Sequence, residues 1–173
     1  MPSPQVEAQR ILRETGAADR LPVDIEAVAR HLGAEVVRER LGRDVSGLLF
    51  RDNERVLIGV NDLHSPKRQR FTVAHEVGHL ALHRGRPLLL DHVRVNFRDA
   101  NSSTATDTEE IQANAFAAEI LMPRAMVMAE ARRLMADPKT TEASIVPDLA
   151  QGFDVSDQAM EYRLINLGLR RQV

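Results

Sequence analysis

Residues 65–85 read SPKRQRFTVAHEVGHLALHRG, and the expected architecture of the whole chain is arranged around this segment. Ser65 is a suitable N-cap, and Pro66 fits the first position of a helix. Apolar residues then recur at helical spacing as far as Gly85, where we expect the helix to end. The segment therefore predicts one long helix with an apolar face.

This predicted helix carries the pattern H-E-x-x-H at His75, Glu76 and His79. Residues four apart lie on the same face of a helix, so both imidazoles can bind one metal ion. Glu76 is displaced by about 100° around the helix, which suits a general base acting on a water rather than a third ligand. Two scattered histidines and a surface glutamate would give the same letters by chance. The small neighbours Ala74 and Gly78, which allow another element to approach, favour the metal site.

A catalytic zinc site needs a third protein ligand. The chain has no cysteine, so imidazole and carboxylate must hold the metal, a donor set that suits zinc, with manganese possible. Glu110 stands near the start of a helix expected from about Asp107, and Asn114, four residues on, could hydrogen-bond an imidazole from behind. The pairs Asp107/Glu110 and Thr106/Glu109 also fit capping boxes, so the residues alone leave Glu110 open between ligand and cap.

Two further histidines are weaker candidates. His83 follows His79 by four residues, but three histidines spaced over about 12 Å of helix cannot meet at one ion. We therefore expect His83 to be a structural residue of the last turn, where the helix dipole favours it. His92 stands in a predicted loop; it is either a hydrogen-bond donor to the reacting group or, more commonly for such a residue, polar surface.

Strand-like segments precede the central helix and predict a small antiparallel sheet, so the expected fold class is α+β. They are Glu35–Arg38, Val45–Arg51 and Arg55–Val60, with one more strand expected at Val93–Phe97. Helices are expected over Pro4–Thr15, behind the N-cap Asp24, and from Asp107 to the end of the chain with interruptions. If Arg55–Val60 is an edge strand, a substrate backbone could pair with it.

A shift in composition near Pro138 predicts two units, residues 1–137 and a small helical extension, residues 138–173. The extension resembles a helix-turn-helix, with VSDQAMEYRL at 155–164 in the place of the recognition helix. This segment contains a single arginine beside the polar or acidic residues Asp157, Gln158 and Glu161. Such a composition argues against a surface that binds DNA phosphates.

Composition narrows the class of protein further. A chain of 173 residues with 43% hydrophobic and 28% charged residues is typical of a globular protein. The net charge of −2 provides no basic field for nucleic acid, so we expect no direct nucleic-acid partner. No apolar run approaches a membrane span, and the first residues lack the pattern of a secretory signal. We therefore expect a cytoplasmic protein with no membrane contact.

Two blocks of the sequence, RFTVAHEVGHLALH at 70–83 and EEIQANAFAAEILMP at 109–123, resemble the ImmA/IrrE family of metallopeptidases. The resemblance implies a zincin-like peptidase core in which His75, His79 and Glu110 bind zinc and Glu76 is the general base. It also implies the biological role, since members of this family act on helix-turn-helix repressors of the XRE type and so induce mobile-element, phage or stress genes. The expected function is a zinc endopeptidase that cleaves such a repressor; the alternative is a metal-stabilised protein that regulates a repressor by contact alone.

Overall fold

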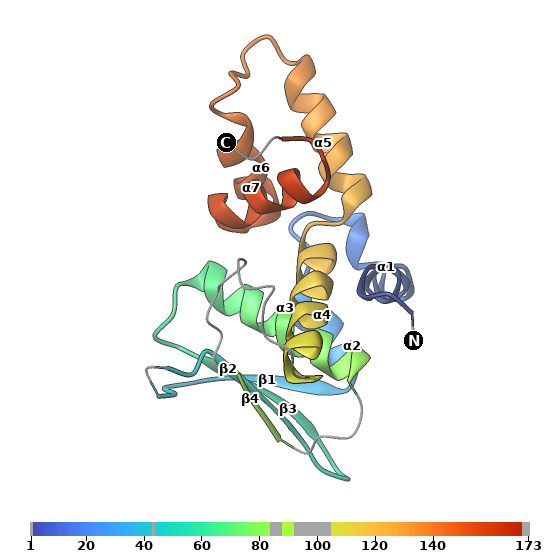
Figure 1. Ribbon diagram of the computed structural model, residues 1–173, viewed down its shortest axis with the longest axis vertical. Helices are drawn as coiled ribbons and strands as arrows, with labels where there is room; N and C mark the ends of the chain where they lie inside the picture. Colours follow the sequence, from blue (N-terminus) through green and yellow to red (C-terminus); the bar gives the residue numbers. More distant parts are fainter. Residues whose placement is uncertain (1, 43, 84–87, 92–104, 171–173) are drawn as a thin grey trace.

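The computed structural model describes residues 2–42, 44–83, 88–91 and 105–170 as an α+β fold (Figure 1). The elements follow in the order α1 (Pro4–Thr15), a 3-10 turn η1 (Ala17–Asp19), α2 (Ile25–His31), β1 (Ala34–Glu39), β2 (Gly47–Arg51), β3 (Val56–Asn61), α3 (Pro66–Leu82), β4 (Leu88–Asp91), α4 (Ala105–Leu121), α5 (Arg124–Ala136), α6 (Ile145–Phe153) and α7 (Asp157–Asn166).

The sheet is mixed, with strand order β1-β3-β2-β4, so the prediction of a purely antiparallel sheet is wrong. Strands β2 and β3 form the expected antiparallel hairpin, and β4 adds antiparallel to the far side of β2. Strand β1 instead runs parallel to β3, with Ala34 opposite Val56 and Glu39 opposite Asn61. The strand around Arg55–Val60 therefore lies between two neighbours, which excludes it as the edge that receives a substrate backbone.

Two boundaries around the second half of the sheet differ from the predicted ones. Strand β4 covers Leu88–Asp91, earlier than the expected strand Val93–Phe97, which lies outside the described residues. Helix α4 begins at Ala105 rather than near Asp107. Thr106 and Asp107 are therefore inside the helix and not at its N-cap, the position that a capping box with Glu109 or Glu110 requires.

The helices gather on one face of the sheet (Figure 1). Helix α3 packs on β2 and β3, α2 packs on β1, and α4 lies against both α3 and α1. Helix α1 begins at its predicted N-cap Ser3, whose hydroxyl accepts a hydrogen bond from the Val6 N–H, and it ends at Gly16 in the left-handed conformation. The core residues Ala8, Ile11 and Leu12 of α1 are buried. This packing fixes α4 against α3.

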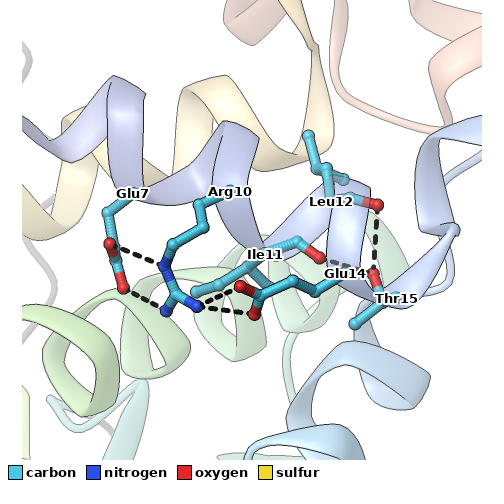
Figure 2. Close-up of polar contacts among 6 residues, drawn as sticks. All are labelled: Glu7, Arg10, Ile11, Leu12, Glu14 and Thr15. Atoms are coloured by element: carbon cyan, nitrogen blue, oxygen red, sulfur yellow. Dashed lines mark hydrogen bonds and ion pairs between the residues drawn. The ribbon is translucent and has the colours of Figure 1, made fainter.

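The solvent face of α1 is stabilised by local ion pairs (Figure 2). The Arg10 guanidinium donates to the carboxylates of Glu7 and Glu14, three and four residues away, and these bonds raise its pKa. The Thr15 hydroxyl donates to the Ile11 carbonyl oxygen at 2.8 Å and closes the last turn. Exposed pairs of this kind stabilise a helix only slightly.

The C-terminal helices α5, α6 and α7 gather above the sheet and its covering helices (Figure 1). A buried ion pair joins them to α4, because the Arg163 guanidinium of α7 donates to the Glu119 carboxylate and also to the Met122 carbonyl oxygen at 3.0 Å. Gln9 of α1 donates to the same carboxylate. The division at residue 137 stays a prediction. The part of the chain that the structure describes contains no candidate for a membrane-spanning helix.

Replacing Arg163 with methionine should lower the free energy of unfolding by about 3–5 kcal/mol, because the Glu119 carboxylate would stay buried without its counter-charge. Thermal or denaturant unfolding followed by circular dichroism measures this change. Arg133→Met is the matched control, since Arg133 pairs with Glu130 at the surface and its loss should leave the unfolding midpoint unchanged. An Arg163→Met midpoint equal to that of the control would show that the buried pair does not hold α7.

Candidate metal centre

Helix α3 places the three residues of H-E-x-x-H in the interior of the protein. His75 and Glu76 have no exposed surface, and His79 is 2% exposed. The helix starts at Pro66 behind Ser65, as predicted, but it ends at Leu82, before Gly85. Arg51 of β2 closes this end, donating to the carbonyl oxygens of His79 at 2.9 Å and His83 at 2.8 Å. The sheet thus fixes the backbone on which the two histidines stand.

Three donor side chains converge in front of α3. The Nε2 atoms of His75 and His79 are 3.0 Å apart, and each lies 3.2 Å from a carboxylate oxygen of Glu110 on α4. In a tetrahedral zinc site with bonds of about 2.0–2.1 Å, the ligand atoms are separated by about 3.3 Å. The three side chains, predicted from three separate positions in the sequence, therefore fit the spacing that one such ion requires.

Hydrogen bonding from α4 supports the same interpretation. The His75 Nδ1 lies 3.0 Å from the Asn114 Oδ1, an acceptor, so Nδ1 carries the proton and Nε2 keeps its lone pair. This lone pair is directed at the His79 Nε2 and the Glu110 carboxylate, a grouping of acceptors that needs a cation or protons between them. Asn114 thus takes the supporting position that the sequence predicted for it.

The electrostatics of the three donors also suit a cation. Burial lowers the pKa of His79, although the hydrogen bond to Glu110 opposes it, and a lowered pKa keeps the imidazole neutral. Burial works to raise the pKa of the Glu110 carboxyl, but the hydrogen bonds and charges of His75 and His79 outweigh it and hold this pKa well below its usual range. A neutral imidazole and an ionised carboxylate are the forms that bind metals.

Glu76 lies on the side of α3 that faces the sheet. A Cβ atom added to Gly47 of β2 would be 3.0 Å from the Glu76 Oε1 and 2.4 Å from the Thr72 Cγ2, so the absence of a side chain at Gly47 makes room for the carboxylate. Burial lowers the pKa of Arg51, and the charge of Glu76 opposes that shift. The carboxylate is therefore buried, with its charge acting on the Arg51 guanidinium, one residue from a predicted ligand.

Gly78 sets the distance between α3 and α4. An added Cβ would be 3.1 Å from both the Cα and the carbonyl oxygen of Ala113, which are backbone atoms that cannot move alone. The glycine therefore lets α4 approach closely enough for Glu110 to reach the histidines.

We expect Gly78→Ala to destabilise the fold by about 1–3 kcal/mol through overpacking, and to weaken zinc binding because α4 must shift. The control is Gly152→Ala in α6, where no atom lies within 4 Å of the added Cβ and the helix should gain up to about 1 kcal/mol. Unfolding curves and a zinc titration of both variants test this. Equal effects of the two substitutions would argue against the close approach.

Sequence reasoning missed the place of His83. This residue is 8% exposed, and its Nδ1 lies 3.0 Å from the His79 Nδ1 while its Nε2 lies 2.9 Å from the Gln112 Oε1. His83 is thus structural, as expected, yet it contacts a predicted ligand directly. The spacing of four residues between His79 and His83 is the signal that could have predicted this contact, since residues four apart lie on the same face of a helix. His92 lies outside the described residues.

An α+β protein whose central helix presents two imidazoles and a buried glutamate, with a carboxylate supplied by a neighbouring helix, has the arrangement typical of a metal-dependent peptidase. The model of the family Peptidase_M78, described as the IrrE N-terminal-like domain, matches residues 29–165. The chain belongs to this family, which confirms the resemblance to ImmA/IrrE.

One similar solved structure is described as a Mycobacterium tuberculosis transcriptional regulator, with 18% sequence identity and a TM-score of 0.60. The similarity covers 94% of this chain and 46% of that chain, so the present chain spans about half the length of the regulator. At this identity the likeness shows the fold alone. The comparison with curated proteins gives no match.

Proposed function

We propose that this protein is a zinc-dependent endopeptidase that cleaves a helix-turn-helix repressor of the XRE type and so relieves repression of a mobile-element, phage or stress regulon. The observation that carries the peptidase proposal is the convergence of His75, His79 and Glu110 beside the buried Glu76, in a member of the Peptidase_M78 family. The repressor as substrate rests on the resemblance to ImmA/IrrE.

His75, His79 and Glu110 would hold the zinc ion, with Asn114 fixing the orientation of His75. Bound zinc supplies Lewis-acid polarisation of the scissile carbonyl group. A carboxylate oxygen of Glu76 accepts a proton from the water that attacks the carbonyl carbon. The same oxygen returns the proton to the amine nitrogen as the C–N bond breaks. The buried surroundings of Glu76 strengthen its electrostatic interactions relative to those in water.

A substrate backbone can pair only with a strand at the edge of the sheet. Among the described residues, β1 and β4 are the outer strands, and β4 pairs with β2, the strand that carries Gly47 opposite Glu76. Strand addition at β4 would bring an extended peptide to the Glu76 side of α3. We therefore propose β4, in place of β3, as the strand along which the substrate lies.

The test is an incubation of the zinc-loaded protein with a purified helix-turn-helix repressor encoded beside it, with the products read by intact mass. Parallel reactions contain the chelator-treated protein and the Glu76→Gln variant. Two fragments with summed masses one water above that of the repressor, formed only by the zinc-loaded wild type, would establish hydrolysis and locate the bond.

The second candidate function is regulation of the repressor by contact. It shares the metal site and makes Glu76 dispensable. An intact repressor that nevertheless loses operator binding equally with the wild type and with Glu76→Gln would favour this candidate.

A further inference from the structure

We propose that Gln112 and His83 form a hydrogen-bonded relay that fixes the tautomer of His79 and directs its Nε2 lone pair toward the metal. This inference rests on the proposed metal site and adds two positioning residues to it. Three contacts carry it: Gln112 Oε1 to His83 Nε2 at 2.9 Å, His83 Nδ1 to His79 Nδ1 at 3.0 Å, and His79 Nε2 to the Glu110 carboxylate at 3.2 Å.

The direction of proton donation along the relay follows from its first member. The amide oxygen of Gln112 can only accept, so the His83 Nε2 must carry a proton and donate it. A neutral imidazole has one N–H, which leaves the His83 Nδ1 as an acceptor. The facing His79 Nδ1 must then donate, and its Nε2 is left without a proton. That is the tautomer in which His79 can bind a metal through Nε2.

The opposite direction would place a proton on the nitrogen that must bind the metal. If the amide of Gln112 were turned, its NH₂ group would donate to the His83 Nε2, and His83 would donate from Nδ1 to the His79 Nδ1. His79 would then carry its proton on Nε2, the atom that lies 3.0 Å from the His75 Nε2. The orientation of one glutamine amide therefore determines whether His79 presents a lone pair or a proton.

The backbone holds the relay in place. The His83 N–H donates to the His79 carbonyl oxygen at 3.0 Å, and Arg51 donates to the carbonyl oxygens of both residues. His83 stands just beyond the end of α3 in an extended conformation, with φ −117° and ψ 93°. This turn away from the helix places its ring 5.1 Å, centroid to centroid, from the ring of His79.

Helix α4 thus orients both histidine ligands, each in a different way. Asn114 accepts directly from His75, whereas Gln112 acts on His79 through His83. The same helix also provides Glu110. Outer partners of metal-bound histidines fix ring orientation, and their loss lowers metal affinity by about 10–100-fold.

The experiment compares zinc affinities, measured by competition with a chromophoric chelator, for the wild type and four variants. Gln112→Leu removes the acceptor and should weaken zinc binding by about 10–100-fold, whereas Gln112→Glu keeps an acceptor oxygen and should restore most of the affinity. His83→Phe should weaken binding to a similar degree. Gln151→Leu, an exposed glutamine of α6, is the control that should bind zinc as the wild type does.

Two further measurements distinguish an effect of the relay on zinc affinity from a general loss of structure. Because Gln112 acts only through His83, the double variant Gln112→Leu/His83→Phe should bind zinc no more weakly than His83→Phe alone. Long-range ¹H–¹⁵N spectra of the zinc-loaded protein should show His83 protonated at Nε2 in the wild type and in Gln112→Glu, with this preference lost in Gln112→Leu.

Wild-type affinity in Gln112→Leu, or additive losses in the double variant, would overturn the relay while leaving the metal site intact. A wild-type protein that binds no zinc would overturn both the relay and the proposed function. The two failures are therefore distinguishable.

Discussion

Replacing Glu76 with glutamine is expected to lower kcat for peptide-bond hydrolysis by about 10²–10⁴-fold, the usual contribution of a general base. Glutamine keeps the size and shape of the side chain in the space left beside Gly47, but its amide cannot accept the proton of the attacking water. Glu76 is not one of the three converging donors, so zinc affinity should change little. Initial rates of repressor cleavage, together with chelator competition, measure both quantities.

Glu54→Gln is the matched control for this prediction, because Glu54 is an exposed residue of the β2–β3 turn. It should cleave at the wild-type rate. If Glu76→Gln also cleaves at that rate with its zinc retained, another group accepts the proton and the mechanism proposed for Glu76 is wrong.

Removing the Glu110 carboxylate, the third proposed zinc ligand, should change zinc affinity rather than kcat alone. Glu110→Ala leaves two imidazoles without their carboxylate. Loss of a residue that only hydrogen-bonds a ligand lowers metal affinity by up to about 100-fold, and we expect the loss of Glu110 itself to lower zinc affinity by more than that. Cleavage at limiting zinc should fall in parallel and recover in part at high zinc, a recovery that Glu76→Gln cannot show.

The control for Glu110→Ala is Glu130→Ala on α5, which removes a carboxylate that pairs with Arg133 at the surface. It should bind zinc as the wild type does. Unchanged zinc affinity in Glu110→Ala would exclude the carboxylate as a ligand and would make its contacts with the histidines a feature of the metal-free protein only.

The central helix and its first residue could be predicted because these signals are local. Ser65, Pro66 and the H-E-x-x-H spacing fall within one helix, and the structure places that helix over Pro66–Leu82. The parallel pairing of β1 with β3 was not predicted, because it depends on which side of the hairpin the earlier strand joins. That choice is made by the helices packing on the sheet and leaves no pattern in β1 itself.

The candidate site was predictable to the extent that its members have typical metal-binding chemistry. Residue type and spacing predicted His75 and His79 as ligands and offered Asn114 as their support, whereas Glu110 was assigned as a ligand only through the resemblance to ImmA/IrrE; the structure brings all four together. The position of His83 depends on where α3 ends, which in turn depends on Arg51, a residue on a distant strand. A boundary fixed from another part of the chain is not visible in the helix sequence.

The buried pair of Arg163 with Glu119 has a consequence for how a substrate reaches the metal centre. Any opening that swung α7 outward would separate the two charges, strand Glu119 in an apolar interior and also release the Met122 carbonyl oxygen. Such a movement would be rare, because leaving one partner of a buried ion pair unpaired costs about 3–5 kcal/mol. We therefore expect α7 to stay in place when the substrate binds. The polypeptide would then enter on the β4 side.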